Sequence, residues 1–489
     1  MKKFKNKIII SAFILTAAGL ITRLLGFAHR IFMTGVIGAE GMGLYQLIFP
    51  VYSLAWAITC AGFTTAVSKL ASSAKAKKDY EAMRAFMIFS AVITGIIALF
   101  ISVLLFFSAN FIATYIFREP RIEIGFKVLS FAIPFMAMGS SIRGFFLGIQ
   151  EAKIPAISQI IEQVMRMFLI YVLSMLYFDT LERAVGIAVL GIVVGEIVSF
   201  LYVIFAYKDR KIKLKTLSRI SKEAKIVKTL LAMSIPLGLS RIISSLLSTA
   251  ENILIPQRLA LYGVENPLEE FGKLTGMAMP LVQFPSAILM ALAISLVPAI
   301  SEASELKNYG QINEAIKKTI LFSMVIGIGA SFGFILFGGE IGSLIYSYNI
   351  EHILSSIGFI VPFIYANMLL LGILNGLGLQ GFIFKNSILY SILSIASVLF
   401  LIPELGIIGY ILGVGGASII VFIFNVIKIK EITSIKIDIL NWFIKPIFAA
   451  FIALGILGFL ENWMISAVVF GIVYLGICYM LLKSQLKNE

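Results

Sequence analysis

Two stretches of this chain carry the same sequence pattern. Phe49-Pro50 opens an apolar run that closes in Ala66-Val67-Ser68-Lys69, and Phe284-Pro285 opens another that closes in Ala299-Ile300-Ser301-Glu302. From there the two stretches stay in register at a constant offset of 233 residues. The chain is therefore built from two related halves. In a membrane protein, duplication of this size is typical of transporters that move one half against the other around a central site.

The composition excludes a soluble protein and indicates many membrane spans. Of the 489 residues, 60% are hydrophobic and 13% charged, and the mean hydropathy is +1.00. A helix of roughly 20 apolar residues crosses a bilayer, and backbone groups in lipid must be satisfied within the helix. We therefore predict an all-α polytopic fold with fourteen spans: 8–34, 42–68, 85–108, 124–149, 155–178, 185–207, 229–257, 274–301, 319–347, 353–379, 386–402, 405–427, 440–460 and 463–482.

The positive charges predict the orientation of these spans. Loops on the cytoplasmic side retain an excess of Lys and Arg. If the N-terminus lies inside, 28 of the 40 basic residues fall on inside segments, five fall outside and seven fall within spans. Both termini are therefore expected in the cytoplasm. The net charge of +14 is explained better by topology than by nucleic-acid binding.

A densely basic segment, 208–228, divides the two halves. Its apolar residues recur at helical spacing, so it is either an amphipathic helix on the anionic inner leaflet or a charged linker. The predicted organisation is an N-lobe of six spans (1–207), this linker (208–228), a C-lobe of six spans (229–430) and two appended spans (431–489). Because each half holds an even number of spans, the repeats should be related by an axis along the membrane normal.

Further matches between the halves involve glycines. Ile133-Pro134-Phe135, followed by Gly144 and Gly148, mirrors Val361-Pro362-Phe363, followed by Gly372 and Gly376. Glycines at this spacing allow helices to pack closely. The duplication therefore extends to the fourth span of each half.

The residues that usually carry catalysis or metal binding are sparse. Cys60 and Cys478 lie inside predicted spans, and the two histidines, His29 and His352, are far apart. We find no metal cluster, redox pair, phosphate-binding glycine loop or nucleophile motif. An enzyme is therefore not expected, and neither is a cofactor.

Arginines inside the spans are the strongest functional signal. Charged residues are costly in hydrocarbon and usually face a cavity or a partner. Arg23 and Arg30 lie two turns apart on one face of the first span, and Arg241 occupies the repeat-related depth in the seventh span. Guanidinium groups suit bidentate binding of phosphate oxygens. We therefore hypothesise that these three residues bind a phosphate-bearing substrate, although each could instead pair with an acid and only hold the bundle together.

Other ionisable residues in the spans are interpreted as pairs or as coupling groups. Glu162 and Arg166 lie four residues apart on the fifth span, which favours a pair within one helix. Arg143 is either functional or extends to the membrane interface. Glu196 and Glu251 are candidates for proton or cation coupling, or for pairing with an arginine.

Several motifs resemble one family. The chain is similar to the stage V sporulation protein B family in two regions. The first is Thr22-Arg23-Leu24-Leu25-Gly26-Phe27 with the run from Gly38 to Gln46, and the second is Arg143-Gly144-Phe145-Phe146-Leu147-Gly148 with the run from Ala156 to Gln163. The resemblance covers essentially the whole chain. It implies membership of the multidrug/oligosaccharidyl-lipid/polysaccharide (MOP) exporter superfamily, with fourteen helices in two lobes, a central cavity and alternating access.

Through its lipid II flippase relatives, the resemblance also implies a substrate. It would be an undecaprenyl-pyrophosphate-linked saccharide such as a peptidoglycan precursor, moved to the outer leaflet of a bacterial cytoplasmic membrane. The sporulation branch of the family implies the spore cortex as one destination. The chain departs from those flippases at two places. Where they have the second basic residue of the first span, this chain has His29, followed by Arg30. Where they have an arginine shortly before the motif that matches Phe284-Pro285-Ser286, this chain has none. The headgroup, the coupling ion or potential and the oligomeric state therefore stay open.

Three alternatives remain at this point. The chain could export another lipid-linked polysaccharide precursor, act as a drug/cation antiporter of the same superfamily, or serve as a scaffold for cell-wall synthases. An antiporter would favour carboxylates and aromatic residues in its cavity, and a scaffold would need no charge in its spans. The last two spans could form a groove for a lipid tail or serve only for packing.

Overall fold

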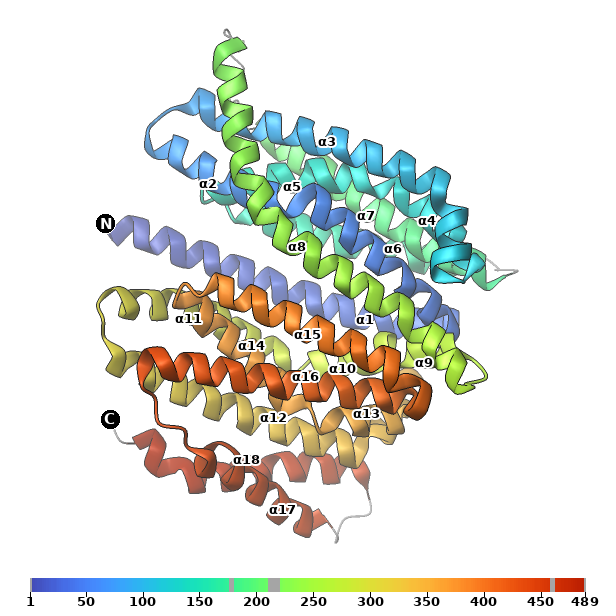
Figure 1. Ribbon diagram of the computed structural model, residues 1–489, viewed down its shortest axis with the longest axis vertical. Coiled ribbons are helices and arrows are strands. Elements are labelled where there is room, and N and C mark those ends of the chain that lie inside the picture. Colours follow the sequence, from blue (N-terminus) through green and yellow to red (C-terminus); the bar gives the residue numbers. More distant parts are fainter. Residues whose placement is uncertain (1, 176–179, 210–219, 458–461, 488–489) are drawn as a thin grey trace. The chain divides into compact units, whose positions relative to one another are not determined.

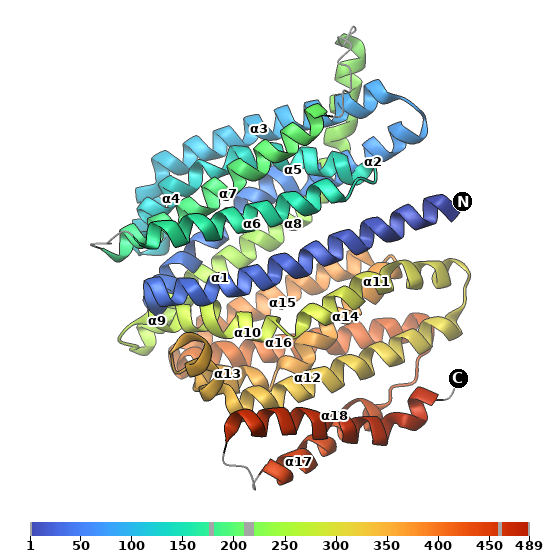
Figure 2. The ribbon, with the colours of Figure 1, turned by 180° about the vertical axis from the view of Figure 1, so that it is seen from behind.

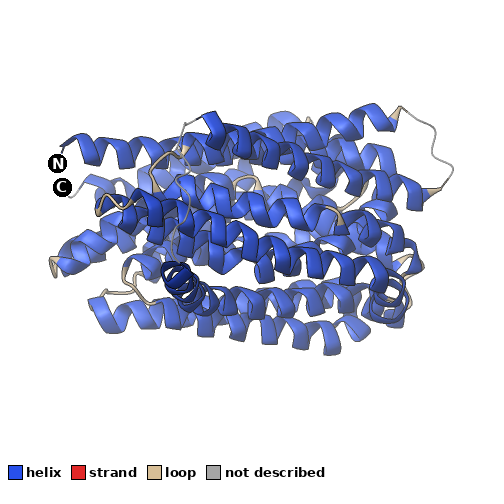
Figure 3. Ribbon diagram, turned by 90° about the horizontal axis from the view of Figure 1, so that it is seen from above, coloured by secondary structure: helices blue, strands red, loops and turns tan. Residues whose placement is uncertain are grey.

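The computed structural model describes residues 2–175, 180–209, 220–457 and 462–487. Within these ranges the chain consists of helices joined by short loops, and no residue forms a strand (Figure 3). This confirms the predicted all-α class. It follows from the composition, because apolar segments in lipid must satisfy their backbone hydrogen bonds internally.

The chain folds into two compact units, which are described separately: the first unit, Met1–Ile253, and the second unit, Leu254–Glu489 (Figures 1 and 2). The first unit holds α1 (Lys2–Trp56), α2 (Gly62–Ala76), α3 (Tyr80–Phe111), α4 (Glu123–Ser130), α5 (Ala132–Gly148), α6 (Lys153–Ser174), α7 (Leu181–Asp209) and most of α8 (Ile220–Tyr262). The second unit holds α9 (Pro267–Gly272), α10 (Met279–Gln283), α11 (Ser286–Glu305), α12 (Tyr309–Tyr346), α13 (Glu351–Gly358), α14 (Val361–Gly376), α15 (Gln380–Phe400), α16 (Ile402–Thr433), α17 (Lys445–Leu457) and α18 (Trp463–Lys487).

The described helices are compatible with the fourteen predicted spans. Ten are long and apolar enough to cross a membrane, and two bent pairs, α4 with α5 and α13 with α14, raise this number to twelve. One of the ten runs from Ile14 to Ala76, but Gly38 has a φ of 68°, which breaks the helix and separates the first two predicted spans. The segment Leu440–Ile456 adds a shorter apolar helix. The chain is therefore a multi-pass membrane protein.

Several spans contain irregular turns that the sequence did not indicate. One π-helical turn, Ala57–Ala61, joins α1 to α2, and another, Lys273–Ala278, precedes α10. The predicted span 274–301 is therefore not one continuous helix, because this π turn and the break at Phe284-Pro285 interrupt it. Further short elements are the π turns Ile112–Phe117 and Leu440–Ile444 and the 3₁₀ turn Pro120–Ile122. Such turns mark bends in helices and often lie near functional sites.

The repeated glycines form the same helix crossing inside each unit. In the first unit, a Cβ placed on Gly144 of α5 would lie 2.6 Å from the carbonyl oxygen of Thr64 on α2. In the second unit, a Cβ placed on Gly372 of α14 would lie 2.5 Å from the carbonyl oxygen of Ala293 on α11. Only glycine permits so close an approach between two backbones.

Helix α8 packs largely against the first unit. A Cβ on Gly62 of α2 would overlap the carbonyl oxygen of Ser234 on α8. Further along, Thr249 donates a hydrogen bond to the carbonyl oxygen of Pro50 at 3.2 Å. The sequence repeat assigns α8 to the second half of the chain, whereas its contacts place most of it in the first unit. The predicted lobe boundaries stay a prediction based on the repeat, and residues 210–219 of the predicted linker lie outside the described residues.

Each unit carries one free and buried cysteine. Cys60 lies in the first unit with none of its surface exposed, and Cys478 lies in the core of the second unit with 3% exposed. Because a thiol reagent reaches a buried cysteine only after unfolding, labelling of Cys60 and Cys478 reports on the stability of each unit separately.

In each unit an acidic side chain contacts a basic residue far away in the sequence. In the first unit, Arg121 binds Glu40 at 2.7 Å. In the second unit, Glu270 of α9 lies 3.2 Å from Nε2 of His352. Glu270 lies outside the membrane-spanning segments, and its hydrogen bond with His352, supported by the charge on Lys273, holds its pKa below the usual range.

We expect the contribution of Glu270 to stability to depend on pH. A carboxyl group whose pKa is lowered in the folded state stabilises that state above its unfolded pKa, and this contribution disappears as the pH falls through the folded pKa. Glu270→Gln should therefore lower the unfolding midpoint of the second unit at pH 7, and the difference from wild type should shrink below about pH 4.5. Cys478 labelling measures the midpoint. The exposed Glu265 gives the control Glu265→Gln, which should change little at either pH.

Candidate functional site

Ionisable side chains from three helices meet inside the first unit. Glu196 of α7 is 2% exposed, and its Oε1 accepts a hydrogen bond of 2.5 Å from the hydroxyl of Tyr52 on α1. Its other oxygen, Oε2, lies 4.0 Å from Nη2 of Arg143 on α5. Arg143 also donates from Nη1 to Ser199 at 3.1 Å. The side chain of Arg143 therefore points toward α7 within the unit.

A second ion pair lies on α6. Nη2 of Arg166 donates to Oε1 of Glu162 at 2.8 Å, and both side chains are largely buried. The spacing of four residues predicted this pair. Glu162 also lines the same cavity as Glu196. The first unit thus buries two carboxylates and two guanidinium groups close to one another.

These groups border a cavity of about 490 Å³ within the first unit. Its walls come from α1, α2, α5, α6 and α7. The lining residues are Leu15, Tyr52, Ser53, Trp56, Thr64, Met136, Ser140, Arg143, Leu147, Pro155, Gln159, Glu162 and Glu196. We call this space the first-unit cavity. Its volume lies within the range of roughly 300–1,000 Å³ that is usual for small-molecule sites.

The three arginines predicted to bind phosphate also lie in the first unit, but none lines this cavity. Arg23 and Arg241 are exposed, on α1 and α8 respectively, and Arg30 is half-buried on α1. Arg30 lies close enough to His29 and Tyr45 for electrostatic interaction. Glu251 is half-buried on α8. The phosphate-binding role of the three arginines and the coupling role of Glu251 stay predictions.

Sequence reasoning missed two members of the buried cluster. Tyr52 binds Glu196 across 144 residues of sequence, and a tyrosine within an apolar span gives no signal of such a partner. His29 is 5% exposed and lies near Arg166, and neither ring nitrogen forms a hydrogen bond within the described residues. The only hint in the sequence was the carboxylate of Glu196, because a buried carboxylate needs hydrogen-bond donors from neighbouring helices.

Amide side chains join three helices of the second unit. Asn386 of α15 donates to Asn425 of α16 at 2.8 Å, and Asn425 donates to Asn367 of α14 at 3.0 Å. In the first unit, the repeat-related pair of helices is joined by Ser158 and Ser199, whose hydroxyls lie 2.9 Å apart. Both units therefore link these helices by contacts between neutral polar side chains, hydroxyls in the first unit and amides in the second.

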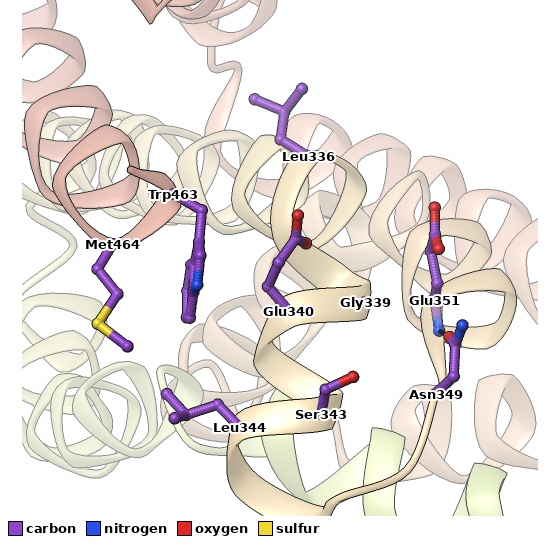
Figure 4. Close-up of a pocket in the computed structure, with 9 residues that line it drawn as sticks. All are labelled: Leu336, Gly339, Glu340, Ser343, Leu344, Asn349, Glu351, Trp463 and Met464. Carbon is purple, nitrogen blue, oxygen red and sulfur yellow. Dashed lines mark hydrogen bonds between the residues drawn. The ribbon is translucent and has the colours of Figure 1, made fainter. Parts of the chain in front are cut away.

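A separate pocket of about 460 Å³ lies within the second unit (Figure 4). It is lined by Leu336, Gly339, Glu340, Ser343, Leu344, Asn349, Glu351, Trp463 and Met464. Figure 4 shows Glu340 and Glu351 extending to the same side of neighbouring helices, with Trp463 beside Glu340. Both carboxylates are exposed, and none of the predicted site residues lies here. Among the residues that the structure describes, no group of three or more His, Cys, Asp or Glu could hold a metal ion.

Comparison with known proteins identifies the family. Residues 9–304 match the family model described as polysaccharide biosynthesis protein. The chain is similar to stage V sporulation protein B of Bacillus subtilis (strain 168), with 29% identity over 478 residues, which cover 96% of this chain and 91% of the relative. It is also similar to the lipid II flippase MurJ of the same organism, with 25% identity over 70% of this chain and 66% of the relative.

The fold has solved counterparts. The chain is similar to the inward-facing structure of a multidrug resistance MATE family transporter of the MOP superfamily, with a TM-score of 0.67 and 16% sequence identity. The alignment covers 84% of this chain and 96% of that structure. The relatives named as a flippase and as a transporter are not enzymes, in agreement with the sequence prediction. The chain is therefore a member of the polysaccharide biosynthesis protein family, similar to stage V sporulation protein B, with the fold of the MOP superfamily.

Proposed function

We propose that this protein is an alternating-access flippase for an undecaprenyl-pyrophosphate-linked saccharide. It would move a precursor resembling lipid II from the inner to the outer leaflet. The family match and the similarity to a lipid II flippase support a lipid-linked polysaccharide precursor as substrate. A role in the spore cortex is a narrower form of the same proposal, supported by the similarity to stage V sporulation protein B.

The charge balance of the spans in the first unit carries the proposal. Five arginines lie in these spans, Arg23, Arg30, Arg143, Arg166 and Arg241, against three carboxylates, Glu162, Glu196 and Glu251. Arg143 and Arg166 are neutralised by Glu196 and Glu162. The other three arginines, Arg23, Arg30 and Arg241, share these spans with one further carboxylate, Glu251, so the spans keep an excess of positive charge. A pyrophosphate is a ligand that would offset the cost of holding this charge in a membrane.

The proposal includes a location and an energy source. The protein would reside in the cytoplasmic membrane of a bacterium with both termini inside, as the distribution of basic loop residues predicts. An ion gradient or the membrane potential would drive transport. Glu162, Glu196 and Glu251 are the carboxylates on which a coupling ion would act. Cell-wall synthases are the partners that such a flippase would supply.

Reconstitution into liposomes tests this function. A fluorescent undecaprenyl-pyrophosphate disaccharide is placed in one leaflet, and the fraction that crosses is measured under proton, sodium and voltage gradients. We expect crossing above the level of protein-free liposomes under at least one gradient. Efflux of a cationic dye without crossing of the lipid would instead identify a drug/cation antiporter. No transport of either compound under any gradient would favour a scaffold.

A further inference from the structure

The first-unit cavity is chemically unlike the arginine set proposed for phosphate. Its wall carries Arg143, Glu162 and Glu196, and Arg166, which does not line the cavity, pairs with Glu162. Two guanidinium groups and two carboxylates give a net charge of zero. A pyrophosphate would meet two carboxylates here, and like charges in a partly buried site repel strongly. The cavity therefore suits a neutral ligand.

The cavity wall retains unused hydrogen-bonding capacity. Oε2 of Glu196 is buried and forms no hydrogen bond within the described residues. Nη2 of Arg143 lies 4.0 Å away, which is too long for a hydrogen bond. A hydroxyl group that donated to Glu196 and accepted from Arg143 would satisfy both. Leaving a buried carboxylate oxygen without a donor is costly, so the site favours a ligand that carries hydroxyls.

Other lining residues extend this chemistry. Gln159 supplies an amide with both donor and acceptor atoms, and Ser53 supplies a hydroxyl. Trp56 is 37% exposed and lines the same space as Tyr52. An aromatic face beside charged and amide groups complements a sugar ring, which has an apolar C–H face and polar hydroxyl edges.

We propose that the first-unit cavity binds a neutral sugar ring of the lipid-linked saccharide. Glu196, Arg143 and Gln159 bind its hydroxyl or acetamido groups, and Trp56 packs against its apolar face. This inference rests on the proposed function and adds to it a separate saccharide subsite, distinct in position and charge from the three arginines proposed for pyrophosphate. The cavity volume of about 490 Å³ admits one or two sugar rings.

Tryptophan fluorescence tests the subsite. The chain has three tryptophans, so Trp442→Phe with Trp463→Phe leaves Trp56 as the only one. The full-length variant in nanodiscs is titrated with N,N′-diacetylchitobiose, a neutral disaccharide. We expect a saturable change in Trp56 emission, and Gln159→Leu should weaken the affinity about fivefold to tenfold, as loss of one hydrogen bond predicts. If the double variant does not fold, the same titration is made on the wild-type chain, where Trp56 contributes part of the signal.

Gln163→Leu is the matched control. Gln163 lies one turn further along α6 and does not line the cavity, so the affinity should stay unchanged. The inference would be overturned by an unchanged Trp56 signal, by equal weakening in both variants, or by tighter binding of inorganic pyrophosphate or sodium than of the disaccharide. If the lipid crosses liposomes while the disaccharide leaves Trp56 unchanged, only the subsite is wrong. If the disaccharide binds but the lipid does not cross, the proposed function is wrong.

Discussion

Replacing Arg143 by Met is expected to destabilise the first unit by about 3–5 kcal/mol, the usual cost of leaving one member of a buried ion pair alone. Glu196 is 2% exposed, and Arg143 is its cationic neighbour at 4.0 Å. Without Arg143, the carboxylate must either stay charged in a poorly solvated site or take up a proton. The denaturant dependence of Cys60 labelling, in a Cys478→Ala background, measures the free energy of unfolding.

Two further variants separate this effect from general damage. Adding Glu196→Gln to Arg143→Met removes the uncompensated charge and keeps an oxygen for Tyr52, so it should restore most of the lost stability. Lys127→Met breaks a partly exposed pair with Glu123 in the same unit and should cost no more than about 1 kcal/mol. If Arg143→Met and Lys127→Met lowered the free energy of unfolding equally, the buried pair would stabilise the first unit no more than the pair of Lys127 with Glu123.

Alanine at Gly144 is expected to destabilise the first unit by about 1–3 kcal/mol or more, because backbone overlap cannot be relieved by moving a side chain. The added Cβ would lie 2.6 Å from the carbonyl oxygen of Thr64. Gly372→Ala should destabilise the second unit similarly, since its Cβ would lie 2.5 Å from the carbonyl oxygen of Ala293. Cys60 labelling should report the first change, and Cys478 labelling the second.

Open glycines provide the controls for this pair. A Cβ at Gly19 in the first unit or at Gly455 in the second would have no neighbouring atom within 4 Å. Both lie inside helices, where alanine is favoured over glycine. Gly19→Ala and Gly455→Ala should therefore be neutral or slightly stabilising. If Gly144→Ala and Gly372→Ala behaved like these controls, the close helix crossings would be wrong.

The fold could be predicted largely from apolar segments and from the repeat. Gly144 and Gly372 were matched by sequence, and they lie at equivalent helix crossings inside their own units. The π-helical turns could not be predicted, because one extra residue in a turn leaves no pattern in an apolar span. The packing of α8 could not be predicted either, because a repeat identifies related helices but not the neighbours against which each one packs.

The buried cluster was predictable only where its partners are close in sequence. Glu162 and Arg166 lie four residues apart, so helix geometry alone pairs them. Arg143 and Glu196 come from different helices, and only the tertiary fold selects that pair from the available arginines and acids. Tyr52 was missed for the same reason.

Transport by an Arg23 series tests the proposed cationic flippase most directly. Arg23→Ala, Arg23→Lys and the control Arg183→Ala, which removes an exposed arginine at the start of α7, are compared in the liposome assay. We expect Arg23→Ala to lower the crossing rate at least about tenfold, as loss of a charge-assisted bidentate contact predicts. Arg23→Lys should fall between, because a lysine keeps the charge but not the planar fork. Arg183→Ala should match wild type. Undiminished crossing by Arg23→Ala would contradict a phosphate-binding role for this arginine.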